Sequence, residues 1–190
     1  IMNIDMAYPE YKCQELKWLP MDTEELFDEN MLNDEGRLRL EKLSWTKNSI
    51  TYKFNDQGFR SDEFDDTGDS IVFLGCSHTV GIGMSWDNTF SKIVSDTLKL
   101  KCFNLGRGGG SMDSCFRFAY YWLEKLKPKI VVILNPSRYR KELIKTDSIC
   151  YLSPNRSNKY EEFYRDWLLE EQNVNMSKEK NSLAIEFLAN

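Results

Sequence analysis

Short apolar runs alternate with amphipathic stretches in the middle of the chain. The run at 71–75 is short and continuously apolar, which is typical of a strand buried on both faces, and 101–105 and 129–134 predict two further short strands. Between them, 86–99 and 112–128 place their apolar residues on one helical face, and the second of these ends at a proline. Strands and helices that alternate with short connections predict right-handed crossovers, so we expect a parallel sheet and an α/β fold.

The N-terminal part of the chain has a weaker pattern. Residues 1–48 are acidic with a helical composition that Gly36 interrupts, and the alternation over 50–54 predicts a short strand. The acidic stretch "DDTGDS" then marks a boundary. We therefore expect an irregular N-terminal arm or cap over 1–69 and an α/β domain over 70–190.

The C-terminal part predicts helices only. Residues 161–172 and 177–190 have helical spacing, and we expect no strand after residue 134. Three strands make a thin sheet, the chain begins with Ile rather than Met, and the last helix runs to the final residue. We therefore expect the α/β domain to be incomplete at its C-terminus.

Composition excludes several functional classes. The chain has 25 Lys and Arg and 30 Asp and Glu, a net charge of −5, so we do not expect phosphate contacts to nucleic acid. No apolar run is long enough to span a membrane, and no export signal is visible, which predicts a cytoplasmic or virion-associated location. Five scattered cysteines without a C-x-x-C pair predict reduced, buried thiols and no metal site. The glycine loops lack the order of phosphate-binding motifs, so we expect no cofactor.

Each predicted strand of the α/β region is followed by residues that can build a site. They are "GCSH" at 75–78, "GRGGGS" at 106–111 and "NPSR" at 135–138. The carboxyl ends of parallel strands meet at one edge, so we expect these loops to converge. A serine on a strand-to-helix turn, beside glycine N–H groups and an amide, is suited to bind an oxyanion. In the alternative interpretation, the glycines only form tight turns and Asn135 only bends the chain before Pro136.

These loops resemble the SGNH (GDSL-type) hydrolase family over about residues 50–140. "FLGCSHTVGIG" is similar to the first family block with Cys76 in place of the usual Asp, and "NLGRGGGSMD" is similar to the second. "KPKIVVILNPSRYR" occupies the place of the third block, and "YKFNDQGFRSDEF" looks like the lead-in of some bacterial and phage members. The resemblance implies a flavodoxin-like, three-layer α/β/α sandwich as the fold, and the cleavage or transfer of acyl esters as the activity.

The resemblance also implies roles for individual residues. Ser77 would be the nucleophile, and the N–H groups of Ser77 and Gly109 with the Asn135 amide would form the oxyanion hole. The substrate would be a small ester or an acylated carbohydrate, for example one with O-acetyl groups. Accessory positions near these residues are His78, Gly108, Ser137 and Arg138.

The general base of the family has no counterpart in the sequence. The family supplies it from a D-x-x-H block, which is absent here, and the only histidine is His78. Neighbouring side chains on a turn point apart, so we do not expect His78 to reach the Ser77 hydroxyl. Asp87 and Asp113 are more simply interpreted as helix-start residues.

Two hypotheses therefore stay open. In the first, the chain is a serine esterase whose D-x-x-H lies beyond Asn190. In the second, it keeps the fold without the chemistry and has a structural or binding role, for example in a phage virion. In that case we expect self-association or an assembly partner that binds the 1–69 arm.

Overall fold

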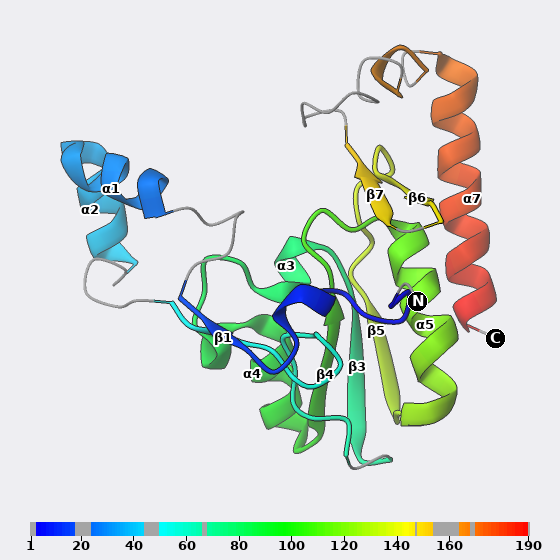
Figure 1. Ribbon diagram of the computed structural model, residues 1–190, viewed down its shortest axis with the longest axis horizontal. Coiled ribbons are helices and arrows are strands. Elements are labelled where there is room, and N and C mark those ends of the chain that lie inside the picture. Colours follow the sequence, from blue (N-terminus) through cyan, green and yellow to red (C-terminus); the bar gives the residue numbers. More distant parts are fainter. Residues whose placement is uncertain are drawn as a thin grey trace.

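The computed structural model describes residues 3–17, 24–43, 50–65, 68–146, 148–153, 164–167 and 170–189. Its helices and strands follow one another from a short N-terminal turn to a long C-terminal helix (Figure 1). In chain order they are η1 (Pro9–Tyr11), β1 (Glu15–Leu16), α1 (Glu24–Leu32), α2 (Asp34–Lys42), β2 (Tyr52–Lys53), β3 (Ser70–Gly75), α3 (Ser77–Val80), η2 (Trp86–Asn88), α4 (Phe90–Leu98), β4 (Lys101–Gly106), α5 (Met112–Leu126), β5 (Ile130–Ile133), β6 (Lys141–Ile144), β7 (Ile149–Leu152) and α7 (Glu171–Ala189).

The central sheet is parallel, with β3 between β4 and β5. This confirms the predicted mixed α/β fold with a parallel sheet. All six residues of β3 are buried, as a continuous apolar run predicts. The predicted strand at 129–134 is also present as β5, but Ile130 and Val131 are exposed because β5 has only one neighbour, β3, in the described part of the sheet.

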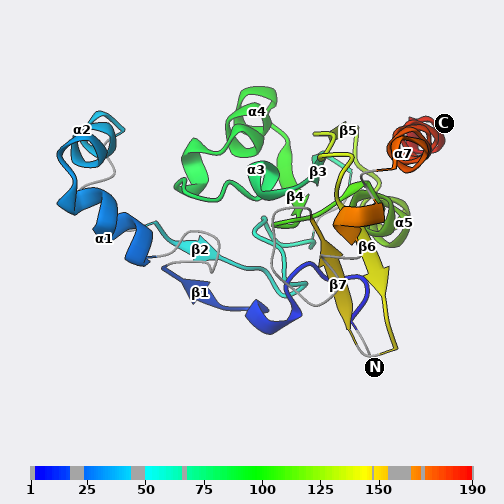
Figure 2. The same cartoon turned by 90° about the horizontal axis from the view of Figure 1, so that it is seen from above.

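Helices pack on both faces of this sheet (Figure 1, Figure 2). Val72 and Leu74 of β3 face α5 in the larger core, whereas Ile71 and Phe73 face α4 in a smaller one. Successive side chains of a strand point to opposite faces, so one short apolar run supplies both cores. The sheet is therefore covered from both sides.

The helix boundaries follow from their caps. The Thr89 hydroxyl accepts a hydrogen bond from the N–H of Lys92, so α4 begins at Phe90 and the start of the predicted 86–99 helix is a separate short turn. Ser111 and Ser114 form a capping box at the start of α5, which ends before Pro128 as predicted.

The N-terminal helices break at a different residue from the one the sequence indicated. Gly36 lies inside α2, and the break is at Asn33, whose side chain accepts hydrogen bonds from the N–H groups of Glu35 and Gly36. The two helices pack on each other and extend away from the sheet (Figure 1). An asparagine cap therefore outweighs the glycine in setting this boundary.

Other described residues before position 70 belong to the core of the sheet. Tyr8, Tyr52, Phe54 and Phe59 are fully buried in the cluster that contains α5. The indole Nε1 of Trp122 donates to a backbone carbonyl of the N-terminal segment at 2.7 Å. The short strand expected near 50–54 is β2, which pairs with β1 rather than with the main sheet.

The prediction of no strand after residue 134 is wrong. Strands β6 and β7 form an antiparallel hairpin beside the start of α5. Each strand has four residues, and β6 begins with Lys141 and Glu142, so its sequence shows neither a continuous apolar run nor an alternation that would predict a strand. The carboxylate of Glu142 in this strand is buried in an ion pair with Arg117 of α5.

The last helices differ in extent from the prediction. Residues 164–167 are helical, whereas 161–163 and 168–169 lie outside the described residues. Helix α7 begins at Glu171 rather than at residue 177 and packs against α5. Among the described helices, none combines the length and the apolar character that crossing a membrane requires.

Candidate functional site at the carboxyl edge of the sheet

The three loops predicted to carry the site lie together at the carboxyl ends of the strands. The N–H of Arg107 in the second loop donates to the carbonyl of Gly75 in the first, at 3.1 Å. A Cβ on Gly75 would lie 3.1 Å from the carbonyl oxygen of Leu134, and one on Gly110 would lie 3.5 Å from that of Gly75. The loop after β3 therefore contacts the chain that follows β4 and the chain that follows β5.

Ser77 begins the short helix α3 directly after β3. Its carbonyl accepts hydrogen bonds from the N–H groups of Gly81 and Ile82, at 3.0 and 3.1 Å, and Gly81 closes the turn with a φ of 75°. The Ser77 side chain is partly exposed, and neither its hydroxyl nor its N–H bonds to any residue that the structure describes. The serine predicted as a nucleophile is thus held on a fixed turn with both of its polar groups available.

The glycine loop after β4 has donors in two different states. The N–H of Gly108 donates to the hydroxyl of Tyr8 at 2.7 Å, and that of Gly110 donates to the Arg107 carbonyl at 2.8 Å. Gly109 has a left-handed φ of 73°, and its N–H has no acceptor in the described part of the chain. Of the three consecutive glycines, only Gly109 presents a free N–H.

Tyr8 determines which N–H group of the glycine loop is already bonded. Tyr8 is fully buried, and its ring packs against the guanidinium of Arg107, 4.1 Å from the ring centroid. Burial raises the pKa of the Tyr8 hydroxyl above its ordinary value, although Arg107 opposes part of this change. Tyr8 therefore stays protonated and neutral, and occupies the N–H of Gly108.

The third loop provides the predicted asparagine. Asn135 is exposed, and within the described ranges its side chain makes no hydrogen bond. The two accessory residues of this loop have local roles: Ser137 Oγ accepts from the N–H of Tyr139, and Arg138 Nη2 donates to the Tyr139 hydroxyl at 2.7 Å. Asn135 is thus the free polar side chain of the three.

The predicted partners for proton transfer are not assembled around Ser77. His78 is exposed and bonds to none of the side chains described. The Asp113 carboxylate accepts from the Ser111 hydroxyl and from the N–H of Glu142, at 3.1 and 3.0 Å, so it joins the start of α5 to β6. No base contacts the Ser77 hydroxyl in the described structure.

Arg60 is a buried element of this edge that the sequence analysis missed. It is 2% exposed, and its guanidinium donates to the carbonyls of Val80 and Gly81, at 3.1 and 2.7 Å. It also donates to the carbonyls of Thr51 and Met84. Arg60 therefore holds the segment that follows Ser77, and the arginine within the lead-in "NDQGFR" was the available signal.

Asn104 supports the same turn from β4. Its side-chain nitrogen donates to the carbonyl of Thr79 and to the Ser91 hydroxyl, and its oxygen accepts from the N–H of Gly106 at 3.0 Å. These hydrogen bonds fix α3 against β4.

Metal chemistry has no donor set in the described residues, where no group of three or more His, Cys, Asp and Glu side chains is placed to hold an ion. Cys76, Cys102 and Cys115 are buried as predicted, whereas Cys13 is exposed and Cys150 is half-buried. Comparisons with known protein families, curated proteins and solved structures found no match to this chain.

Proposed function

We propose that this chain is a serine ester hydrolase of the SGNH (GDSL) type, on a flavodoxin-like three-layer α/β/α sandwich, with Ser77 as the nucleophile. The observation that carries the proposal is the state of the donors at the sheet edge. The N–H groups of Ser77 and Gly109 and the Asn135 side chain have no partner among the described residues, whereas the N–H groups of Gly108 and Gly110 are satisfied. These three are the donors that the family resemblance assigns to the oxyanion hole.

In the proposed reaction, Ser77 Oγ attacks the ester carbonyl, and its proton passes to a general base that the described residues do not supply and that the family provides from its D-x-x-H block. The carbonyl oxygen becomes an oxyanion that the three donors bind, and each such donor lowers the barrier by about 2.7–4 kcal/mol. The C–O bond to the alcohol then breaks, the alcohol takes the proton, and the acyl group stays on Ser77 until water releases it. We expect a small ester or an O-acetylated carbohydrate as substrate.

The test is the hydrolysis of p-nitrophenyl acetate by the purified protein. We expect Ser77→Ala to abolish the enzymatic rate and Asn135→Ala to reduce it about 100-fold. Ser85→Ala is the matched control, because Ser85 is also exposed and its hydroxyl caps no helix N–H. Mass spectrometry should find the acetyl group on Ser77. Equal rates for the wild type and Ser77→Ala would refute the nucleophile.

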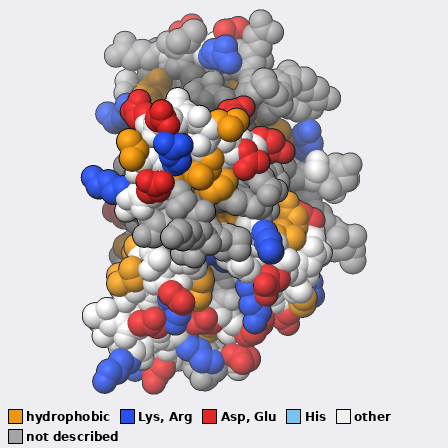
Figure 3. Space-filling view, turned by 90° about the vertical axis from the view of Figure 1, so that its left-hand side faces the viewer, with side chains coloured by type: hydrophobic (Ala, Val, Ile, Leu, Met, Phe, Trp, Pro, Cys, Tyr) orange, Lys and Arg blue, Asp and Glu red, His pale blue; other side chains and the backbone are white. Residues whose placement is uncertain are grey.

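A second candidate is a binding or structural protein that keeps this fold without catalysis. It is favoured by the absence of a base near Ser77 in the described structure and by the exposure of His78. Figure 3 views the molecule from the side of α1 and α2, where apolar side chains lie among charged ones. Leu26, Leu32 and Leu38 are exposed on these helices and would supply a contact to a second copy or an assembly partner.

This candidate predicts no turnover and a concentration-dependent mass in light scattering. Leu32→Glu should return the protein to a monomer. The control is Glu29→Lys, a change of charge at an exposed position of the same helix, which should leave the association intact. Under either candidate we expect a cytoplasmic or virion-associated location. A monomer that hydrolyses the ester through Ser77 would rule this candidate out.

A further inference from the structure

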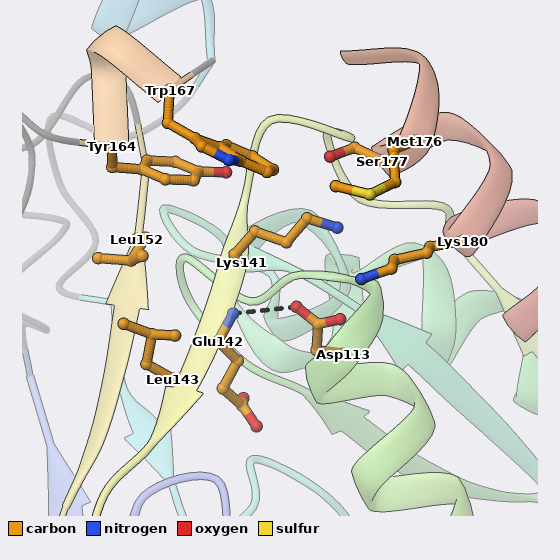
Figure 4. Close-up of a pocket in the computed structure, with 10 residues that line it drawn as sticks. All are labelled: Asp113, Lys141, Glu142, Leu143, Leu152, Tyr164, Trp167, Met176, Ser177 and Lys180. Carbon is orange, nitrogen blue, oxygen red and sulfur yellow. Dashed lines mark hydrogen bonds between the residues drawn. The ribbon is translucent and has the colours of Figure 1, made fainter. Parts of the chain in front are cut away.

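A cavity lies beside the start of α5, and Ser77 does not line it. Its volume is about 490 Å³, within the range of small-molecule sites. Four elements surround it: the hairpin of β6 and β7, the first turn of α5, the helical residues 164–167 and the N-terminal half of α7 (Figure 4). Two walls and a roof therefore come from parts of the chain that are far apart in sequence.

The roof and one wall of the cavity are apolar. The rings of Tyr164 and Trp167 are 5.8 Å apart between centroids with 18° between their planes, and together they cover the top of the cavity in Figure 4. Leu143 and Leu152 line the side below them. Burial, and to a lesser extent Asp113, raises the pKa of Tyr164 to about 12, so its hydroxyl stays neutral and donates to the Tyr139 carbonyl at 3.0 Å. This surface suits a flat, apolar ring system.

The charges that face the cavity do not cancel. The amino groups of Lys141 and Lys180 both point into it from opposite walls, and neither forms an ion pair with the residues described (Figure 4). Asp113 points in from below, whereas the Glu142 carboxylate turns away and is paired with Arg117 at 2.6 Å. Two ammonium groups therefore face one carboxylate, which leaves one positive charge without a partner.

A buried hydroxyl also lacks a partner in this cavity. Ser177 is 1% exposed, and its Oγ has no hydrogen-bond partner among the residues that the structure describes. The oxygen points from α7 toward Trp167 and the interior of the cavity (Figure 4). Leaving a buried hydroxyl unsatisfied is unfavourable, so a ligand that offers an acceptor here would remove this cost.

We infer that this cavity binds a small aromatic carboxylate, with its ring system under Tyr164 and Trp167 and its carboxylate between Lys141, Lys180 and the Ser177 hydroxyl. The aromatic roof and leucine wall select the ring system, and the excess of ammonium groups selects the negative charge. The Ser177 hydroxyl contributes one hydrogen bond, and a donor binds a carboxylate more strongly than a neutral or cationic head group of the same size. The inference does not depend on ester hydrolysis at Ser77.

Calorimetric titration of the protein with three ligands of matched shape tests this. The probe is 2-naphthoate, and its neutral and cationic counterparts are 2-naphthamide and 2-naphthylmethylammonium. We expect 2-naphthoate to bind about tenfold more tightly than 2-naphthamide, and the cation not to bind measurably.

Two substitutions on the same helix locate the site. Lys180→Met should remove most of the preference for 2-naphthoate over 2-naphthamide. Lys178→Met is the matched control, since Lys178 is exposed on α7 and does not line the cavity, and it should leave the preference unchanged. The ring current of the bound ligand should also shift the methyl NMR signal of Met176, identified by its loss in Met176→Leu.

Binding at the Ser77 edge would give a different pattern. In that case Asn135→Ala would weaken 2-naphthoate binding, Lys180→Met would not, and the Met176 signal would stay in place. That pattern would overturn the inference. Equal affinity for 2-naphthoate and 2-naphthamide would also overturn it, as would equal effects of Lys178→Met and Lys180→Met.

Discussion

Replacing Arg60 by methionine should destabilise the whole chain and loosen the turn that carries Ser77. The guanidinium is 2% exposed and lies 4.3 Å from the centroid of the Tyr52 ring. It donates to four backbone carbonyls, one at Thr51 and three in the segment that follows Ser77. Methionine has a similar length and fills much of the volume but donates no hydrogen bond.

The size of the effect follows from the acceptors that are left behind. The bonds to the carbonyls of Val80 and Gly81 are buried, and an unsatisfied buried acceptor costs about 1–3 kcal/mol. This cost applies in full to the Val80 carbonyl, because the Gly81 carbonyl keeps the hydrogen bond that it accepts from the N–H of Met84. The bonds to Thr51 and Met84 are only partly buried, so water can replace part of them. Removing the arginine also removes the cost of burying its charge. We expect a net loss of about 3–5 kcal/mol for Arg60→Met, and a smaller loss for Arg60→Lys, which can reach fewer of the carbonyls.

Urea unfolding followed by circular dichroism measures this loss, which corresponds to a shift of about 2 M in the midpoint. The control is Arg39→Met, because Arg39 is exposed on α2 and should change stability by less than about 0.5 kcal/mol. Hydrogen exchange at the amides of Gly81 and Ile82 should become faster in Arg60→Met. A loss below about 1 kcal/mol with unchanged exchange would show that Arg60 does not hold this turn.

Three further predictions concern other fixed points of the fold. Gly81→Ala should destabilise the protein by about 3 kcal/mol in urea unfolding, because a Cβ there would overlap Thr89 Cγ2. The control is Gly68→Ala, where a Cβ meets open space and the positive φ alone should cost about 1–2 kcal/mol. Arg117→Met should lower the free energy of unfolding by about 3–5 kcal/mol, because it leaves the buried Glu142 carboxylate without its cationic partner. The double variant Arg117→Met/Glu142→Leu should recover much of this loss, and an equal loss in the single and double variants would contradict the reasoning. Burial raises the pKa of Cys102 and Cys115 to about 12, so at pH 8 iodoacetamide should alkylate the exposed Cys13 and leave these two unmodified until the protein unfolds, as peptide mass spectrometry can measure.

The elements that the sequence predicted correctly are those whose residues carry a signal by themselves. The run "SIVFLG" is apolar at every position of β3 after the first, and only burial on both faces of a sheet accommodates such a run. The stretch "FSKIVSDTL" of α4 has its apolar residues on one face, and Phe90 and Val94 of this face pack on the sheet, whereas Ile93 and Leu98 are exposed. The parallel order then follows from the short connections.

The elements that were missed depend on partners from elsewhere in the chain. Strand β6 begins with a lysine and a glutamate, and the glutamate is buried only because Arg117 in α5 neutralises it. Arg60 is buried because four carbonyls from two distant segments surround it. Local pattern assigns a charged residue to the surface, so it cannot predict either side chain.

The candidate site shows the same limit at the level of single N–H groups. The sequence places three glycines in a row after β4, and nothing in their identity distinguishes one donor from another. The distinction comes from Tyr8, one hundred residues earlier in the chain, whose hydroxyl accepts from Gly108. With Gly110 bonded inside the loop, Gly109 is the one glycine of the three whose N–H has no acceptor among the described residues. Tyr8→Phe tests this reasoning directly, because freeing the N–H of Gly108 should change how the loop binds an oxyanion while Ser77 stays where it is. The N-terminal segment, which looked like an appendage in the sequence, therefore takes part in defining the site through one hydroxyl group.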